Sequence, residues 1–364
     1  MMSTKNMKTM LLLAACSLSC SKSSNSRGQV EKVLPSGTDE AVDADGIDTT
    51  GGDPVPDATA PVTPNEMCTM SSSPEMFSNP GTPREIPVPF TFQFMEGPVW
   101  LENSQALLVS AWNFSDPTYG KGPPTTILKF ENNAWSIWSD KGIFGSNGLA
   151  VDRDNKVIAA LHDRQELAQI SADGTRASLG GSYLGENFNS PNDLTVRSDG
   201  TIYFTDPNYQ RDGRPGRGSV TGVYALTPER VVVPVDLNLK QPNGIALSPD
   251  ETVLYAGGGD GKIFRYLIET DGNTKPDGIL ATPGFNVDGM AVDCAGNVYA
   301  AIPREQAVYV YAPTGVLLSK ITGFGYNTTN VALGGRDKNI MFVTTAGHVF
   351  EMQLGTPISP TGSR

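Results

Sequence analysis

The sequence predicts an all-β fold, a six-bladed β-propeller. The first indication is a short phrase that recurs six times, in which one polar residue with a side-chain oxygen precedes an apolar alternation. The six polar residues are Glu96 in MEGPVW, Asn147 in SNGLAVD, Asn192 in SPNDLTV, Asn243 in QPNGIALS, Asp288 in VDGMAVD and Asn330 in TTNVALGG. Successive polar residues are 51, 45, 51, 45 and 42 positions apart, a period typical of propeller blades.

A hairpin pattern follows each phrase and supports the same fold. After Asn147, for example, residues 149–151 alternate as a strand, Asp154 and Asn155 provide a turn, and residues 157–160 form a second strand. Third strands are predicted at residues 167–170, 220–226, 263–267, 308–311 and 348–352. No long window repeats its apolar residues at helical spacing, so the chain is predicted to be mostly antiparallel β.

The segments before the first phrase and after the last predict where the propeller begins and ends. Residues 86–92, IPVPFTF, form a plausible strand with no repeat partner, and we expect them to complete the last blade and close the ring. Their two prolines suit an edge strand, because proline cannot donate to a ladder. The propeller is therefore expected over residues 85–355, with a flexible tail at residues 356–364.

The six polar residues of the phrases are predicted to face the channel, because the first strand of each propeller blade lines the axis. All six carry side-chain oxygen and none is Cys or His. Oxygen ligands favour a hard divalent cation, so Ca²⁺ is the first expectation, Mg²⁺ or Mn²⁺ the next, and Zn²⁺ the least favoured. In a simpler interpretation, Asn-Gly and Asp-Gly are tight-turn residues at blade starts, which leaves Glu96 unexplained.

The ordered phrases EGPVW, SNGLAVD, SPND, TDPNY, PNGIALSPDE and DGMAVD resemble the gluconolactonase, regucalcin and senescence marker protein family. The resemblance covers about residues 85 to 355, and the ordered set is specific although each phrase alone is a weak signal. It implies a six-bladed propeller with one catalytic divalent cation in its channel, usually calcium, that hydrolyses sugar lactones and related cyclic esters.

Matching motifs place the family's metal ligands on Glu96, Asn243 and Asp288. Asn192 stands where the family has a residue beside the metal that also meets the substrate, and it is a fourth candidate ligand. An arginine found two residues earlier in the animal regucalcins is here Ser190, so substrate recognition is expected to differ from theirs.

The chemistry of lactone opening is consistent with this set. A lactone needs its carbonyl polarised and a water delivered to it, and a cation held by few protein ligands keeps open positions for both. The resemblance makes Asp288 the general base, with Asp206 and Asp193 as alternatives. Asp206 precedes Pro207, where an aspartate is more often a structural turn residue. No Ser/His/Asp arrangement is evident in the sequence.

Other candidate substrate contacts are expected near the channel mouth. Asn147 is one. His162 is another, since bacterial gluconolactonase-like sequences carry histidine in a similar phrase, and a hydrogen-bonded turn histidine is the alternative. Two Gly/Pro-bearing insertions, residues 121–124 and 210–218, are expected to form a lid over one mouth or to be solvated loops. The second contains three arginines that would suit an anionic or polyhydroxylated ligand, Arg211, Arg214 and Arg217.

The first 84 residues differ in composition from the repeats. Two lysines and a short apolar run lead into the box LAAC, which ends at Cys16 and resembles a bacterial lipoprotein signal whose cysteine is lipidated. We expect residues 1–16 to be a signal segment and residues 17–84, rich in Ser, Asp, Pro and Gly, to be a disordered tether. Ser17 favours delivery to the outer membrane, so the expected location is the periplasm or cell surface, with the lipid as the membrane contact.

Charge and cysteine use are consistent with export. The formal net charge is -12, and nothing in the sequence indicates nucleic-acid binding. With Cys16 lipidated and Cys20 in the tether, Cys68 and Cys294 remain near or in the folded part. An oxidising compartment permits a disulfide between them, but the sequence does not give the Cα separation that the bond requires.

Together these observations predict a monomeric metal-dependent lactonase acting on a small-molecule lactone. Two alternatives use the same residues: a binding or scaffold propeller with a structural calcium, and a phosphotriesterase-like hydrolase. The sequence identifies neither the lactone nor the metal.

Overall fold

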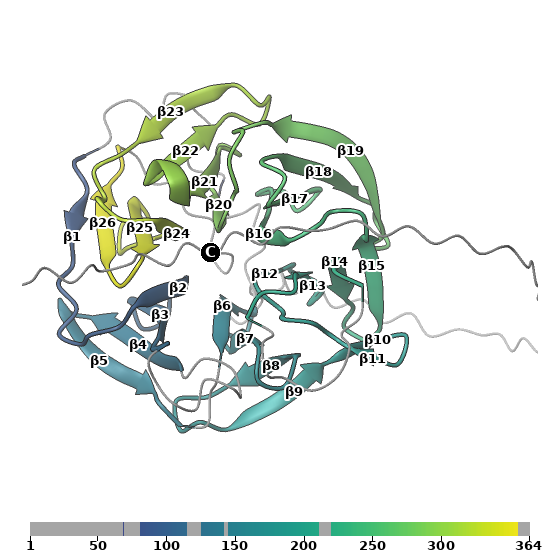
Figure 1. The fold of residues 1–364 in the computed structure, drawn as a ribbon, viewed down its shortest axis with the longest axis horizontal. Coiled ribbons are helices and arrows are strands. Elements are labelled where there is room, and N and C mark those ends of the chain that lie inside the picture. Colours follow the sequence, from purple (N-terminus) through teal and green to yellow (C-terminus); the bar gives the residue numbers. More distant parts are fainter. Residues whose placement is uncertain (1–67, 69–80, 115–124, 142–144, 211–219, 356–364) are drawn as a thin grey trace, which may run out of the picture. The chain divides into compact units, whose positions relative to one another are not determined.

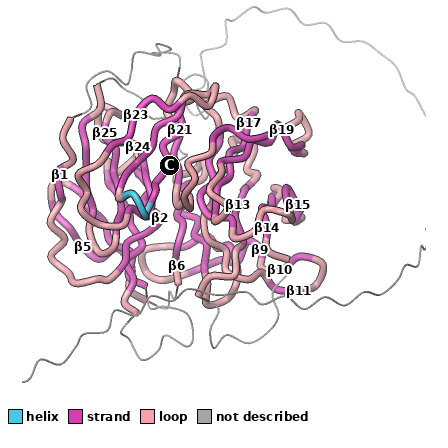
Figure 2. The backbone as a smooth tube through the Cα atoms, turned by 45° about the horizontal axis from the view of Figure 1, so that its top comes forward, coloured by secondary structure: helices cyan, strands magenta, loops and turns pink. Residues whose placement is uncertain are grey.

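In a computed structural model of the chain, the described residues are 68, 81–114, 125–141, 145–210 and 220–355. The chain divides into two units, Met1–Asp57 and Ala58–Arg364, and every described residue belongs to the second. The predicted signal segment, the predicted tail and nearly all of the predicted tether lie outside the described residues. Figure 2 shows strands throughout the second unit, with a short 3₁₀ helix at Pro303–Glu305.

Six antiparallel sheets of four strands surround a common centre, as Figure 1 shows, so the predicted six-bladed propeller is confirmed. The first three blades, each from its inner to its outer strand, are β2 (Phe94–Leu101), β3 (Ala106–Trp112), β4 (Thr125–Glu131) and β5 (Ala134–Ser139); β6 (Ser146–Val151), β7 (Val157–Leu161), β8 (Glu166–Ile170) and β9 (Arg176–Gly180); and β12 (Leu194–Val196), β13 (Ile202–Asp206), β14 (Gly222–Leu226) and β15 (Val232–Asp236).

The last three blades follow the same order. They are β16 (Pro242–Leu247), β17 (Val253–Gly258), β18 (Ile263–Ile268) and β19 (Thr274–Ala281); β20 (Met290–Val292), β21 (Val298–Ile302), β22 (Ala307–Tyr311) and β23 (Leu317–Ile321); and β24 (Thr328–Gly334), β25 (Ile340–Thr345), β26 (Val349–Gln353) and β1 (Arg84–Glu85). A two-stranded hairpin, β10 (Ser182–Tyr183) and β11 (Glu186–Asn187), lies between the second and third blades in the chain.

The last blade is closed by the chain segment that precedes the first, as predicted, but by a different strand. Strand β1 pairs with β26, and the Ile86 N–H extends the pairing by donating to the Val349 carbonyl at 2.9 Å. The expected strand at residues 86–92 is therefore wrong in position. Pro87 has no N–H and stops the ladder, and the apolar side chains that follow pack against the core between the first and last blades.

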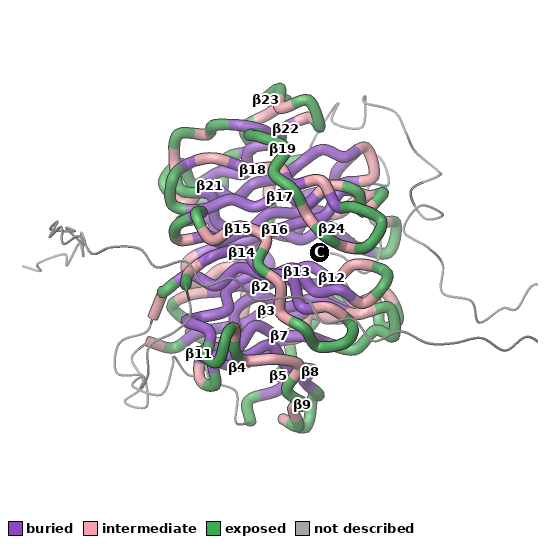
Figure 3. Tube along the Cα trace, turned by 90° about the vertical axis from the view of Figure 1, so that its right-hand side faces the viewer, coloured by how far each residue is buried: buried purple, intermediate pink, exposed green. Residues whose placement is uncertain are grey.

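Six hydrophobic clusters fill the spaces between the blades, one for each pair of neighbours. Successive residues of a strand face different clusters, since side chains alternate across a sheet. In β6, Leu149 and Val151 face the first blade and Ala150 faces the third. Both faces of a blade are thus buried, and Figure 3 shows the buried residues concentrated along the strands and the exposed ones at the turns.

Glycine follows the polar residue in four of the six phrases because neighbouring inner strands approach closely there. A Cβ on Gly244 would lie 2.1 Å from the carbonyl oxygen of Asp288 in the next blade, and one on Gly289 would lie 1.8 Å from Asn330 Oδ1. Neither glycine has a positive φ, so a left-handed turn does not explain them. The close approach of neighbouring blades explains why glycine stands at both positions. This argues against the interpretation of the Asn-Gly and Asp-Gly pairs as tight turns.

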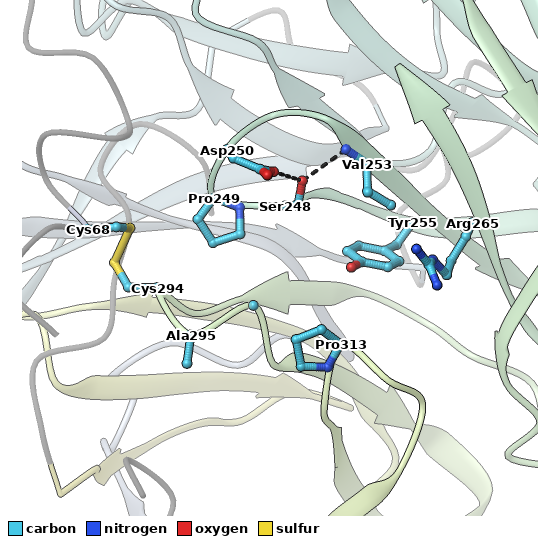
Figure 4. Close-up of a pocket in the computed structure, with 11 residues that line it drawn as sticks. Cys68, Ser248, Pro249, Asp250, Val253, Tyr255, Arg265, Cys294, Ala295 and Pro313 are labelled. Atoms are coloured by element: carbon cyan, nitrogen blue, oxygen red, sulfur yellow. Dashed lines mark hydrogen bonds between the residues drawn. A yellow bond between two sulfur atoms is a disulfide. The ribbon is translucent and has the colours of Figure 1, made fainter. Parts of the chain in front are cut away.

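Cys68 and Cys294 form a disulfide with their Cα atoms 5.1 Å apart, the pairing that the sequence left open. Figure 4 shows the bond beside a cavity of about 480 Å³, with Tyr255 and Arg265 on its far side. Turns between the first and second strands of the fourth and fifth blades line it. These turns lie at the opposite ends of the inner strands from the phrases, so the cavity is distinct from the channel site.

The described part of the chain contains no helix with the length and hydrophobicity of a membrane span. The expected lipid anchor at Cys16 lies outside the described residues and stays a prediction.

We predict that Gly244→Ala destabilises the propeller by about 3 kcal/mol, because the new methyl group collides with the backbone of the next blade and the two inner strands must separate. Urea unfolding of the metal-free protein measures this. The matched control is Gly180→Ala in β9, where the added carbon would meet the two methyl groups of the Leu226 side chain, at 3.3 and 3.6 Å, and should change stability by less than about 1 kcal/mol. Equal losses in the two variants would contradict the close-packing explanation.

Candidate functional site

The six polar residues of the phrases lie on the innermost strands or directly before them, as predicted. Strands β2, β6, β12, β16, β20 and β24 surround the centre of the ring in Figure 1. All six side chains are at most 8% exposed, although they sit where a propeller has its channel. The residues are Glu96, Asn147, Asn192, Asn243, Asp288 and Asn330.

The phrases interrupt the regular pairing of the inner strands, which allows their side chains to turn toward the axis. The register with the second strand shifts between Glu96 and Val99 in β2, and equivalent shifts occur at the phrases of β6, β16 and β24. Such irregularities re-aim side chains, and they commonly occur next to functional sites. Strands β12 and β20 instead begin within their phrases, two residues beyond Asn192 and Asp288.

Contacts between neighbouring phrases run around the ring. The Gly148 N–H donates to the Asn192 backbone carbonyl at 2.7 Å, and the Gly289 N–H donates to the Thr329 backbone carbonyl, also at 2.7 Å. Between the third and fourth blades the Thr205 hydroxyl donates to the Asn243 carbonyl at 2.7 Å.

The ring closes where the last blade meets the first. There the Asn330 amide donates to Glu96 Oε2 at 3.2 Å, and the Gly97 N–H donates to the same oxygen at 3.1 Å. The phrases are therefore fixed relative to one another by their own backbone and side chains.

Two carboxylates meet inside this ring. Burial raises the pKa of Asp288 well above its ordinary value, and the negative charge of Glu96 raises it further. A hydrogen bond from the Asn243 side chain acts in the opposite direction. Among the described residues, no ion pair involves Asp288. The site thus concentrates negative charge that a cation would neutralise.

This donor set fits a hard divalent cation. Two carboxylates balance its charge, and amide oxygens add ligands without adding charge. The described residues hold no group of three or more His, Cys, Asp and Glu that could hold a metal ion. Glu96, Asn243 and Asp288 are the residues that the interactions above bring together, and Asn192 lies on the same ring.

Asp206, an alternative general base in the sequence analysis, has a structural role. Its fully buried carboxylate accepts hydrogen bonds from the backbone N–H groups of Asn189, at 2.9 Å, and Ser190, at 2.7 Å. These bonds hold the segment that leads into Asn192. The other alternative, Asp193, is also buried; its backbone N–H donates to Thr205.

Sequence reasoning missed Tyr209, which follows Asp206 in the TDPNY phrase. Its hydroxyl donates to the Gln241 carbonyl at 3.2 Å. Burial raises the pKa of Tyr209, the negative charge of Asp288 raises it further, and the Asn243 side chain lowers it. The only signal in the sequence was its presence in the phrase, because the distance to the fourth blade depends on how the blades pack.

His162 lies at the mouth, directly after β7. Its backbone N–H donates to the Gly145 carbonyl at 3.0 Å, and its ring packs edge-on against Trp112 with the ring centroids 5.4 Å apart. The side chain is fully buried within the described residues, so its contact with substrate stays a prediction. Trp112 in turn donates to the Ser146 carbonyl at 2.7 Å, which ties this corner to the Asn147 phrase.

The predicted lid segments fall largely outside the described residues. Residues 115–124 and 211–219 are not described, and these include all three arginines of the second insertion.

Comparison with known proteins agrees with the geometry. Residues 94–347 match the family described as the SMP-30/Gluconolactonase/LRE-like region. The chain belongs to this family. A gluconolactonase of Zymomonas mobilis is 31% identical over 76% of this chain and 82% of its own length. A pentonolactonase, XacC, of Haloferax volcanii is 26% identical over 59% of this chain and 72% of its own.

Solved structures of the family share the fold. A gluconolactonase of Xanthomonas campestris superposes with a TM-score of 0.63 at 27% identity, covering 73% of this chain and 87% of that one. A calcium-binding regucalcin of Agrobacterium tumefaciens superposes with a TM-score of 0.62 at 19% identity, over 78% of this chain and 96% of that one. The second likeness concerns the fold alone.

We predict that Asp288 makes the metal-free propeller less stable as pH rises. The pKa of Asp288 is raised above 3.8 in the folded state, so the folded chain keeps a proton that the unfolded chain has released. The resulting stability is fully present below 3.8 and is lost as pH rises through the folded pKa.

Thermal midpoints in chelator from about pH 5 to about pH 8 measure this decline. Asp288→Asn should weaken the dependence of the thermal midpoint on pH. A bound divalent cation should abolish this dependence in the wild type. Parallel pH profiles for the wild type and Asp288→Asn would show that Asp288 is not the group responsible.

Proposed function

We propose that this family member is a divalent-cation-dependent lactonase acting in the propeller channel on sugar lactones or related cyclic esters. The observation that carries the proposal is the convergence of Glu96 and Asp288, buried and close enough to raise the pKa of Asp288, with the Asn243 amide beside them. Relatives named gluconolactonase and pentonolactonase support the substrate class.

The cation is proposed to be held by Glu96, Asn243 and Asp288, with Asn192 as a further ligand, and Ca²⁺ is the first choice because every donor is an oxygen. A divalent cation supplies the charge that polarises the lactone carbonyl and makes a nearby water more acidic. Because few protein oxygens would hold it, such a cation would leave positions open for substrate.

Asp288 is proposed to take the proton from the attacking water. The water oxygen forms a bond to the carbonyl carbon, the ring C–O bond breaks, and the proton is returned to the departing ring oxygen, which gives the open hydroxy acid. Asn147 and Asn192 are proposed to contact the hydroxyl groups of the substrate, since both amides stand on the ring around the axis.

We predict that metal-stripped protein is inactive on a panel of aldonolactones and simple γ- and δ-lactones, and that one of Ca²⁺, Mn²⁺, Mg²⁺ or Zn²⁺ restores turnover. Asp288→Asn should lower kcat at saturating cation by at least about 10²-fold, because the general base is removed. The matched control is Asp337→Asn, an exposed aspartate in the turn between β24 and β25, which should keep wild-type turnover.

A folded, cation-binding protein that turns over no lactone would favour the binding or scaffold alternative. Turnover of phosphotriesters but not of lactones would favour the phosphotriesterase-like alternative. Full activity of Asp288→Asn would overturn the assigned role of Asp288 while leaving the activity itself in place.

A further inference from the structure

The ring is closed by a short strand with few contacts of its own. Strand β1 is two residues long, and both of its residues, Arg84 and Glu85, are exposed. Their side chains contact Glu351 and His348 in the last blade. Surface contacts between charged side chains contribute little to stability. A strand of this kind is expected to open more readily than the rest of its blade.

Two backbone hydrogen bonds flank this pairing. The Gly81 N–H donates to the Gln353 carbonyl and the Ile86 N–H donates to the Val349 carbonyl, both at 2.9 Å. Ile86 is 3% exposed and belongs to the hydrophobic cluster between the first and last blades. The C-terminal end of β1 is therefore firmly held by core packing, and opening is expected to begin at the Gly81 end.

The disulfide between Cys68 and Cys294 holds the chain on the other side of β1. It attaches Cys68 to the fifth blade, and Ile86 is fixed 18 positions later in the sequence. When β1 opens, it therefore lies within a closed loop, whose conformations are far fewer than those of a chain free at one end. The disulfide thus disfavours the opening of β1 without contacting it.

The turn that carries Cys294 is held independently of the disulfide. It lies between β20 and β21, and the neighbouring Asp293 is fully buried. The Asp293 carboxylate accepts hydrogen bonds from the backbone N–H groups of Ala295, at 2.9 Å, and Asn297, at 2.8 Å. Loss of the disulfide is therefore expected to release the chain before β1 and to leave the inner strands unchanged.

The disulfide is accessible in the folded protein. Cys68 and Cys294 are both partly exposed, and both line the cavity of about 480 Å³ drawn in Figure 4. A small dithiol can reach the sulfur atoms from this cavity. Its thiolate attacks one sulfur and the S–S bond breaks; the cysteines gain two electrons and two protons as thiols, and the dithiol is oxidised to a disulfide.

We propose that the Cys68–Cys294 disulfide is a redox-sensitive anchor of the closing strand. While the bond is intact, β1 stays on the last blade. Its reduction by a dithiol lets β1 open, and the residues of the channel keep their arrangement. This inference goes beyond the proposed function, because it involves neither a cation nor a lactone.

Hydrogen exchange of the full chain tests the proposal, with the amides of Gly81 and Ile86 as reporters. Treatment of the folded protein with dithiothreitol, with the thiols then verified by peptide mapping, should accelerate exchange in peptides spanning residues 81–86 by about 10²-fold. A closed loop of this length restricts the open state by a factor of that order. Exchange in peptides spanning residues 286–302, which include Asp288, should not change.

Variants separate the disulfide from other effects of the reductant. Cys68→Ser combined with Cys294→Ser should give the fast exchange at residues 81–86 without dithiothreitol. The matched control is Cys20→Ser, which leaves the disulfide in place and should exchange as the oxidised wild type does.

Three results would contradict the proposal. Equal exchange at residues 81–86 before and after reduction would show that the disulfide does not hold β1. Acceleration of similar size at residues 286–302 would show that the bond stabilises the whole propeller and has no local role. A disulfide that dithiothreitol reduces only after the protein unfolds would exclude a switch in the folded state.

Discussion

Close packing between the inner strands of neighbouring blades is the constraint on which the site depends. The phrase of one blade lies against the phrase of the next with no room for a side chain, as the contact of Gly244 with the Asp288 carbonyl shows. Hydrogen bonds such as that from Gly148 to Asn192 continue this contact. Since each phrase is fixed by its neighbours, polar residues about 45 positions apart in the sequence occupy one small volume.

The same packing creates an electrostatic cost. Glu96 and Asp288 are both buried. Burial and the negative charge of Glu96 raise the pKa of Asp288 in the metal-free protein. Asn330 and the Gly97 N–H donate to Glu96, and the Asn243 side chain lowers the pKa of Asp288, which reduces the cost without supplying positive charge. The proposed divalent cation would remove the repulsion, so the arrangement proposed to bind it is the one that destabilises the metal-free protein. Local destabilisation of this kind is typical of functional sites.

Much of this could be predicted from the sequence because the information is repeated. Six copies of one phrase specify the number of blades and the strands that face the axis, and the residue types at Glu96, Asn243 and Asp288 indicate the cation class. The closing strand was misplaced because β1 is only two residues long, and its pairing depends on β26, far away in the chain. Tyr209 was missed because its hydroxyl contacts Gln241 in the next blade, and no local pattern in the sequence predicts a contact between blades.

The central claim is that the phrases converge on one cation, and an anomalous difference map of metal-stripped crystals soaked in Mn²⁺ tests it most directly. The account predicts one strong peak on the channel axis, within about 2.0–2.6 Å of oxygens from Glu96, Asn243 and Asp288. A channel without a peak, or a peak bound by other residues, would contradict the account.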